Sequence, residues 1–334
     1  MPTALIQGRI AVQYVDLLEK YLSEDWDVLV WDPARNDPSE FPAMAAKADC
    51  MVGGAIPSKH WPAIPNLKLF QIPWTGYDFC SPQTMPANVP VCNCFEHESA
   101  IAEYVLGGML EMSLGLRKLD QDFRKGGWNG KNPGENSPHG ELRDATVGIV
   151  GYGHIGIEVA KRAKAFGMRV IGTRRSEQET PKPLDWLGTS DKINQLLSES
   201  DFVVVACDLN AETEGMIAEE QFAQMKSNAL IINVARGRVI KETALYAALK
   251  SKRIGGAVLD VWYTYNTPGT PEVWPSNEPF HELENVLLSA HESASSHRMW
   301  ERRWEFVAQN FMLAAAGQTP KNFVFHGAQE PEQA

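Results

Sequence analysis

The sequence lacks the features that mark membrane, secreted and nucleic-acid-binding proteins. No apolar run approaches the roughly 18 residues that a membrane-spanning helix needs, and no basic segment precedes an apolar stretch at the N-terminus, as it would in a signal peptide. Positive charge is in deficit, with 31 Lys and Arg against 42 Asp and Glu and a net charge of −11, whereas a nucleic-acid partner requires a basic face. We therefore expect a cytoplasmic protein whose partners include neither a membrane nor a nucleic acid.

Cysteine is scarce as well, at five in 334 residues. Cys92 and Cys94 would share one face of a strand, a spacing open to a metal or redox pair, but no second Cys or His pair lies nearby at a ligand spacing. Buried reduced thiols are the better interpretation, and we expect no metal site.

The chain alternates short β-branched runs with helical stretches, a pattern typical of α/β architecture with doubly wound parallel sheets. Its length predicts about two domains. A long helix is predicted over residues 101–116 and a long loop over 126–141. The predicted strands form a first series at residues 3–7, 27–31, 49–52, 67–73 and 89–93, and a second series at 146–150, 168–172, 202–207, 230–234, 257–261 and 286–289.

The last predicted helix, around residues 299–316, is apolar at helical spacing and needs a partner surface. Trp300, Trp304 and Phe311 lie on its apolar face. The first series of strands can supply the partner surface, so the two ends of the chain would form one domain around an insertion. We predict one domain over residues 1–98 plus 293–334 and a second over residues 99–292.

A glycine-rich turn follows the first strand of the second series. Residues 151–156 read Gly-Tyr-Gly-His-Ile-Gly between a predicted strand and a predicted helix. In a nucleotide-binding (Rossmann) unit the first glycine allows a tight turn, the second lets backbone approach a pyrophosphate, and the third lets the helix pack on the strand. The alternative is that the glycines only turn a strand into a helix. The residues assigned here to a cofactor are Gly151, Gly153, His154, Ile155 and Gly156.

The segment after the next strand selects the nucleotide. A site for NAD places an Asp or Glu there to accept the ribose hydroxyls, but this chain reads Thr173-Arg174-Arg175 with no carboxylate before Glu177. Two guanidinium groups suit a 2′-phosphate. The sequence therefore favours NADP over NAD, with two ordinary surface arginines as the alternative.

Three further segments carry a resemblance to a known family. Residues 233–237 (Asn-Val-Ala-Arg-Gly) and 285–291 (ending Ser-Ala-His) follow or end predicted strands, and residues 256–262 follow a predicted helix. With the glycine turn, in this order, they resemble the D-isomer-specific 2-hydroxyacid dehydrogenases over about residues 67–312. The resemblance implies a flavodoxin-like substrate domain around an inserted Rossmann domain, a homodimer assembled through helix 101–116, and hydride transfer between NAD(P)H and a small 2-oxo acid.

The same resemblance assigns roles to single residues. Arg236 matches the arginine that binds the substrate carboxylate and polarises the carbonyl, and His291 matches the general acid/base. Asp260 matches a residue that holds the nicotinamide carboxamide, although a buried aspartate there could simply anchor a turn. The loop that meets the substrate carboxylate is matched by the backbone of Trp74, Thr75 and Gly76. The remaining residues assigned to the cofactor are Thr173, Cys207, Asn233, Val234 and Ala235.

One position departs from the family. The family places a glutamate beside the histidine, five residues after the aspartate, and that position here is Tyr265. A neighbouring carboxylate raises the pKa of an imidazole, whereas a phenol adds no charge. We therefore expect His291 to titrate near the unperturbed value of about 6.5, unless Glu292 supplies the missing charge. Tyr265 joins Arg236 and His291 in the predicted catalytic set.

Three functions remain open at this point. We expect reduction of a 2-oxo acid such as glyoxylate or hydroxypyruvate. A nucleotide-sensing binding protein on the same fold is an alternative, but a sensor would not need both Arg236 and His291. The missing glutamate leaves formate- or phosphite-type oxidation as a second enzyme hypothesis.

Arg298, Arg302 and Arg303 lie at helical spacing in the last predicted helix. They either form a solvated face or bind a second substrate anion.

Overall fold

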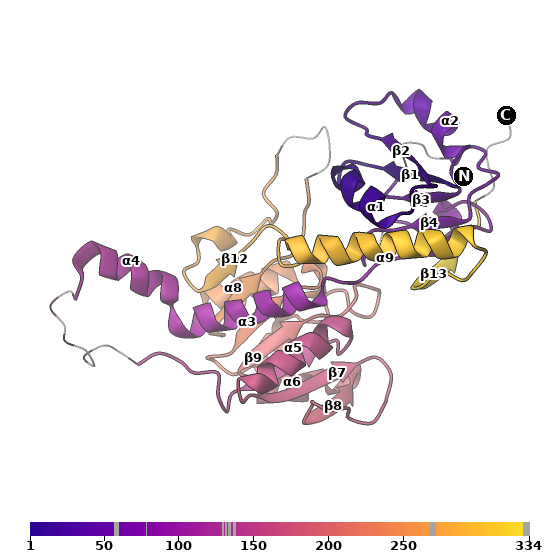
Figure 1. The fold of residues 1–334 in the computed structure, drawn as a ribbon. Helices are drawn as coiled ribbons and strands as arrows, with labels where there is room; N and C mark the ends of the chain where they lie inside the picture. Colours follow the sequence, from indigo (N-terminus) through magenta and orange to yellow (C-terminus); the bar gives the residue numbers. More distant parts are fainter. Residues whose placement is uncertain are drawn as a thin grey trace. The chain divides into compact units, whose positions relative to one another are not determined.

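The chain divides into two compact units. A computed structural model describes residues 1–56, 60–77, 79–128, 130, 132, 135, 138–266 and 272–329. The first unit comprises Met1–His97 with Ser295–Ala334, and the second is the continuous segment Glu98–Ala294 (Figure 1). In the described part of the chain no helix is long and apolar enough to cross a membrane.

The first unit is built on a six-stranded sheet. Its strands are β1 (Thr3–Gln7), β2 (Asp27–Trp31), β3 (Cys50–Val52), β4 (Leu69–Gln71), β5 (Pro90–Cys92) and β13 (Phe323–His326), in the spatial order β13-β5-β4-β3-β1-β2. All neighbouring strands are parallel except β13 and β5, which are antiparallel. The helices of this unit are α1 (Val15–Tyr21), α2 (Phe41–Ala45) and α9 (His297–Ala315). As predicted, α9 packs in one core with strand residues of the N-terminal segment, and its Trp304, Val307 and Phe311 are fully buried there.

The second unit is built on a seven-stranded sheet that is parallel throughout. Its strands are β6 (Thr146–Val150), β7 (Arg169–Arg174), β8 (Trp186–Thr189), β9 (Phe202–Val205), β10 (Leu230–Asn233), β11 (Gly256–Leu259) and β12 (Val286–Leu288). Its helices are α3 (Glu98–Leu114), α4 (Leu116–Gly126), α5 (His154–Ala165), α6 (Ile193–Glu199), α7 (Glu219–Gln224) and α8 (Glu242–Lys250). The strand order is β12-β11-β10-β9-β6-β7-β8. The order reverses between β6 and β9, and in open parallel sheets ligands bind at the carboxyl ends of the strands beside such a reversal.

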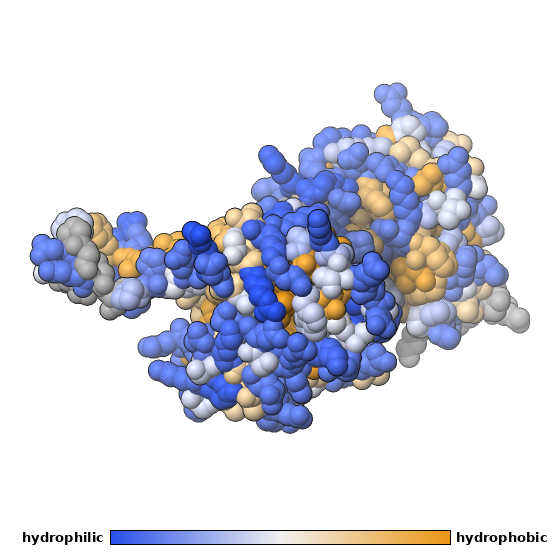
Figure 2. All heavy atoms as spheres, turned by 90° about the horizontal axis from the view of Figure 1, so that it is seen from below, coloured by the Kyte–Doolittle hydropathy of each residue, from blue (hydrophilic) through white to orange (hydrophobic). Residues whose placement is uncertain are grey.

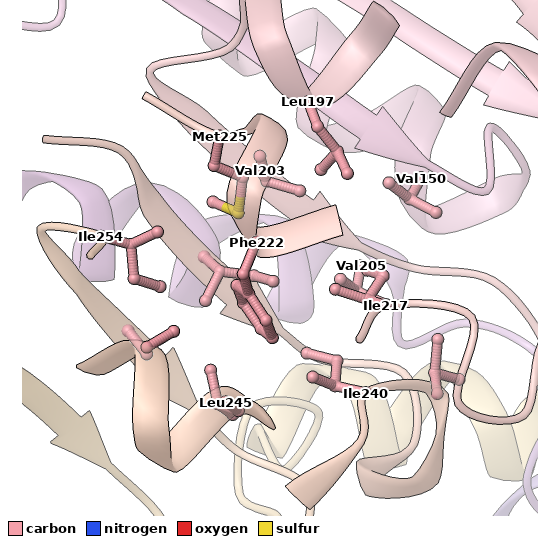
Figure 3. Close-up of a cluster of buried hydrophobic side chains, with 14 of the residues drawn as sticks. Val150, Leu197, Val203, Val205, Ile217, Phe222, Met225, Ile240, Leu245 and Ile254 are labelled. Carbon is pink, nitrogen blue, oxygen red and sulfur yellow. The ribbon is translucent and has the colours of Figure 1, made fainter. Parts of the chain in front are cut away.

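One core of the second unit lies where α7 and α8 cover the central strands. The ring of Phe222 from α7 sits among Val203 and Val205 of β9 and Leu245 of α8 (Figure 3). Phe222 is 2% exposed, and burying a phenylalanine side chain stabilises a fold by about 1.5–3 kcal/mol. This packing fixes the carboxyl ends of β9 and β10, from which the candidate site residues extend.

All eleven predicted strands are present, most with ends shifted by one or two residues. Two observed strands were not predicted: β8, which adds a parallel edge to the second sheet, and β13, the antiparallel edge of the first. The predicted helix 101–116 is α3, which begins at Glu98. Gly115 then adopts a left-handed conformation (φ +66), and a second helix, α4, occupies the next eleven residues. The predicted loop 126–141 falls partly outside the described residues.

Candidate active site

At each of the three glycine positions in the turn after β6, a different physical reason favours a residue without a side chain. Gly151 has φ +94, and a Cβ built on it would lie 2.5 Å from the Cys207 backbone nitrogen. A Cβ on Gly156 would lie 3.0 Å from Cγ2 of Ile149 in β6, so a glycine lets α5 pack close to the strand. A Cβ on Gly153 would meet no atom within 4 Å. The open space at Gly153 fits the approach of a pyrophosphate to the N–H groups at the start of α5.

The end of β7 carries two arginines and lies against the glycine turn. The backbone nitrogens of Gly151 and Tyr152 donate to the Thr173 carbonyl at 3.0 and 2.8 Å. Arg174 follows Thr173 and contacts Oε1 of Gln178, and its Nε is buried without a hydrogen-bond partner among the described residues. Arg175 is exposed. These residues fit a dinucleotide with an anionic group at this end of the site.

His154 and Cys207 flank the turn in different ways. Nδ1 of His154, the first residue of α5, lies 3.9 Å from Oε1 of Glu98 in α3. Cys207 packs against Gly151, and burial raises the pKa of its thiol to about 12. Cys207 is therefore a packing neighbour of the turn and stays a neutral thiol near pH 7.

Arg236 is presented by a tight turn after β10. The buried Asn233 side chain accepts a hydrogen bond from the Ala235 nitrogen at 3.1 Å and donates to the Arg236 carbonyl at 3.0 Å. A Cβ on Gly237 would lie 2.3 Å from the Trp262 carbonyl oxygen, so only glycine permits this contact. The turn thereby holds Arg236 beside the segment that follows β11.

Asp260 anchors the turn that carries His291. Its buried carboxylate accepts hydrogen bonds from Ser289 Oγ at 2.5 Å, from the Glu292 nitrogen at 2.8 Å and from the Ser293 nitrogen at 3.1 Å. His291 lies between these donors with φ +61. The observed contacts of Asp260 are therefore those of a residue that anchors a turn. Its contact with a nicotinamide carboxamide stays a prediction.

Tyr104 also supports the turn that carries His291, and its role was not predicted from the sequence. The hydroxyl of Tyr104 in α3 lies 2.6 Å from Ser289 Oγ, which in turn donates to Asp260. Tyr104 and Ser289 therefore extend the support of His291 into α3. In sequence Tyr104 was only one polar residue in a helix, and no spacing connects it with Ser289.

The phenol of Tyr265 contacts the imidazole of His291. Its oxygen lies 3.0 Å from Nδ1 of His291 and accepts a hydrogen bond from the Trp262 nitrogen at 3.2 Å. Desolvation by surrounding protein atoms lowers the pKa of His291 below its usual 6.5, and the charge of Arg236 lowers it further, while Asp260 and Glu292 oppose the shift. The expectation of a value near 6.5 therefore needs correction downward, because the nearby carboxylates do not offset desolvation.

The predicted substrate-loop residues lie in the first unit. The Cys94 nitrogen donates to the Trp74 carbonyl at 3.1 Å, and the Thr75 hydroxyl donates to the Cys94 carbonyl at 2.9 Å. Nε2 of His97 lies 3.2 Å from Thr75 Oγ1. The loop including Gly76 is thus tied to the segment after β5. Asp78, two residues after Gly76, lies outside the described residues.

Two of the three arginines in α9 bind backbone carbonyls of the first unit, one of them buried and the other half-buried. Arg303 is 4% exposed and donates through Nε and Nη2 to the Phe95 carbonyl at 3.2 and 3.1 Å. Arg302 donates to the Glu96 carbonyl at 2.9 Å. These two arginines hold residues 95–96, just before Met1–His97, the N-terminal part of the first unit, ends. Arg298 is exposed.

Three of the four cysteines of the first unit are thiols in the core, as predicted, whereas Cys80 is only half-buried. Cys50, Cys92 and Cys94 are buried. Burial raises the pKa of Cys92 to about 12, and Cys94 donates to the carbonyl of Arg303. Within the described ranges no group of three or more His, Cys, Asp or Glu could hold a metal ion.

Comparison with known proteins agrees with this geometry. The family model "D-isomer specific 2-hydroxyacid dehydrogenase, NAD binding domain" matches residues 106–293. The glyoxylate reductase of Thermococcus kodakarensis is 32% identical over 313 residues, 91% of each protein. That of Korarchaeum cryptofilum is 41% identical over 182 residues, 54% of this chain and 52% of that protein. The solved structure of an acyclic imino acid reductase in complex with NADPH and D-Arg has a TM-score of 0.77 at 26% identity, over 97% of this chain and 100% of that chain.

A glycine turn at the reversal of a parallel sheet, with an arginine after β10 and a histidine after β12 on either side of β11, defines a nicotinamide-dependent oxidoreductase. The chain belongs to the D-isomer-specific 2-hydroxyacid dehydrogenase family. The predicted fold class and family are thereby confirmed, as is the reaction class, hydride transfer between NAD(P)H and a small 2-oxo or 2-hydroxy acid. When bound, the reduced nicotinamide supplies the hydride.

Replacing Tyr265 with glutamate should raise the pKa of His291. A carboxylate near Nδ1 favours the imidazolium, so we expect a rise of about one unit or more. In both proteins the imidazolium is present below this pKa and lost as pH rises through it. NMR titration of the His291 ring measures the shift. The uncharged, similarly sized Tyr265→Gln is the matched control, and an equal rise in both variants would contradict the charge argument.

Proposed function

We propose that the protein reduces a small 2-oxo acid, such as glyoxylate or hydroxypyruvate, to the D-2-hydroxy acid with NADPH as hydride donor. The observation that carries the proposal is the convergence of Arg236 and His291 in one unit with the glycine turn. The charge of Arg236 is close enough to lower the pKa of His291 and to oppose the rise that burial causes in the pKa of Tyr265. A cation for the carboxylate and a proton donor for the carbonyl oxygen are the two groups that this reduction requires.

In this proposal each group has one task. Arg236 binds the substrate carboxylate and polarises the carbonyl, His291 protonates its oxygen, and the backbone of residues 74–76 contacts the carboxylate. Residues 99–292 form the cofactor domain, and residues 1–98 with 293–334 form the substrate domain. Glyoxylate reductase is the name of the relatives from Thermococcus kodakarensis and Korarchaeum cryptofilum, which supports the choice of substrate.

A second candidate substrate is a 2-imino acid. A protonated imine already carries its positive charge and needs no proton from His291, whose pKa is lowered. The name and ligands of the acyclic imino acid reductase support this candidate. Assaying each 2-oxo acid with and without methylamine separates the two, because an imine reductase would gain rate with the amine. Assays of formate and phosphite with NAD⁺ and NADP⁺ test the hypothesis of formate- or phosphite-type oxidation.

Arg236→Lys should reduce kcat/KM for a 2-oxo acid by roughly 100-fold or more, because a point charge cannot reproduce the planar fork on a carboxylate. NADPH affinity, measured by fluorescence titration, should change little. Arg238→Lys is the matched control, because Arg238 is exposed and pairs with Glu214. A variant with near-normal turnover would show that Arg236 does not bind the substrate.

The preference for NADP rests on Arg174 and Arg175. Arg174→Asp replaces a cation by an anion where a 2′-phosphate would bind, so kcat/KM should shift from NADPH toward NADH by about tenfold or more, equivalent to about 1.4 kcal/mol. Steady-state kinetics with both cofactors measure the ratio. The same exchange at Arg143, which is exposed, should leave it unchanged. Equal use of both cofactors by wild type and variant would overturn the preference.

The resemblance implied a homodimer assembled through helix 101–116, and a dimer is supported instead by α4, the helix that follows it. This helix buries none of its residues, and Leu116, Leu119 and Phe123 recur at helical spacing with exposed fractions of 53%, 54% and 58%. Figure 2 shows hydrophobic side chains on the part of the surface that contains α4. Exposed apolar faces of this kind mark interaction sites, and we propose a second copy of the chain as the partner.

Phe123→Glu should convert a dimer into a monomer, because it places a charge in the apolar face that a second copy would cover. Light scattering after gel filtration measures the mass. Gln121→Glu adds a similar charge to an exposed position of the same helix and should leave the dimer intact. A monomeric wild type would refute the dimer.

A further inference from the structure

The two hydrogen-bond partners of the Tyr265 phenol favour one direction for its proton. The Trp262 backbone N–H can only donate, so it occupies the acceptor side of the phenol oxygen at 3.2 Å. A phenol oxygen has one hydrogen and one good acceptor direction in the ring plane. Its second neighbour is Nδ1 of His291, at 3.0 Å. Among the described residues, Nδ1 is therefore the acceptor available to the phenolic hydrogen.

This direction selects one tautomer of the neutral imidazole. If Nδ1 accepts the phenolic hydrogen, the ring proton resides on Nε2. The nearest buried carboxylate does not compete, because Asp260 already accepts from Ser289, Glu292 and Ser293. A glutamate in place of Tyr265 would impose the opposite tautomer, since a carboxylate accepts from Nδ1–H and leaves Nε2 without a proton.

We infer that Tyr265 is a proton-relay residue: neutral His291 gives its Nε2 proton to the substrate carbonyl oxygen while Nδ1 takes the phenolic proton of Tyr265. The inference rests on the proposed function. The carbonyl carbon gains the hydride, the electrons of the C=O π bond form the new O–H bond, and the electron pair of the broken Nε2–H bond stays in the ring. The Tyr265 phenolate then takes a proton from water, to which this side chain is 48% exposed.

The relay matters because the imidazolium is scarce near neutral pH. Desolvation and Arg236 lower the pKa of His291 against the charges of Asp260 and Glu292, and a hydrogen bond donated to Nδ1 further favours the neutral ring. Burial also raises the pKa of Tyr265, although the Trp262 N–H and the charge of Arg236 oppose this. An alkoxide is nevertheless a far stronger base than a phenolate, whose usual pKa is about 10, so transfer from Tyr265 through His291 to the substrate is downhill.

Tyr265→Phe tests the relay because it keeps the ring and removes the proton. Wild-type kcat/KM for 2-oxo acid reduction should change less than about threefold between pH 6 and 8.5. In the variant only the imidazolium can supply a proton, so kcat/KM should fall about tenfold per pH unit above the pKa of His291. Tyr263→Phe removes a neighbouring phenol and should retain the wild-type profile. NADPH affinity should be equal in all three proteins.

A tautomer measurement provides a readout independent of turnover. With ¹⁵N-labelled histidine, NMR should show neutral His291 of the wild type as the Nε2–H tautomer and that of Tyr265→Phe as a mixture. Wild-type activity that falls with pH as steeply as that of Tyr265→Phe, or an Nδ1–H wild-type ring, would overturn the relay alone. A wild type that binds NADPH and reduces no 2-oxo acid would overturn the proposed function and the relay with it.

Discussion

The buried carboxylate of Asp260 is the constraint on which the site depends. His291 has φ +61, a conformation uncommon outside glycine, and the three donors to Asp260 fix the residues on both sides of it. A buried carboxylate without such donors would be costly. The aspartate and the turn therefore stabilise each other, and loss of either would release the imidazole from Tyr265.

The parallel sheet explains why residues far apart in sequence gather in the second unit. Arg236 follows β10, Asp260 follows β11 and His291 follows β12, and these three strands are neighbours. All strands point the same way, so the residues that follow them emerge at one edge. Gly237 then brings the β10 turn into contact with Trp262 after β11, which sets the distance between the arginine and the Tyr265–His291 pair.

Sequence patterns predicted what depends on local periodicity and missed what depends on tertiary contacts. The apolar runs of β1, β2 and β6 gave correct strand ends, whereas β13 requires a partner strand more than 200 residues away in the chain. The proximity of Tyr265 to His291 followed from a family resemblance. The direction of their hydrogen bond did not, because a backbone N–H of Trp262 sets it. Likewise, Arg303 reads as a surface charge until α9 packs against Phe95.

The split composition of the first unit has a consequence for biosynthesis. Trp304, Val307 and Phe311 of α9 complete the core that β1, β3 and β4 begin, and α9 follows the whole second unit in the chain. A ribosome therefore releases the whole second unit before it supplies the helix that covers the first sheet. Domains generally fold as units during synthesis, so the inserted unit can fold first. The N-terminal strands must wait with an apolar face open, and in that interval a chaperone or aggregation has access to them.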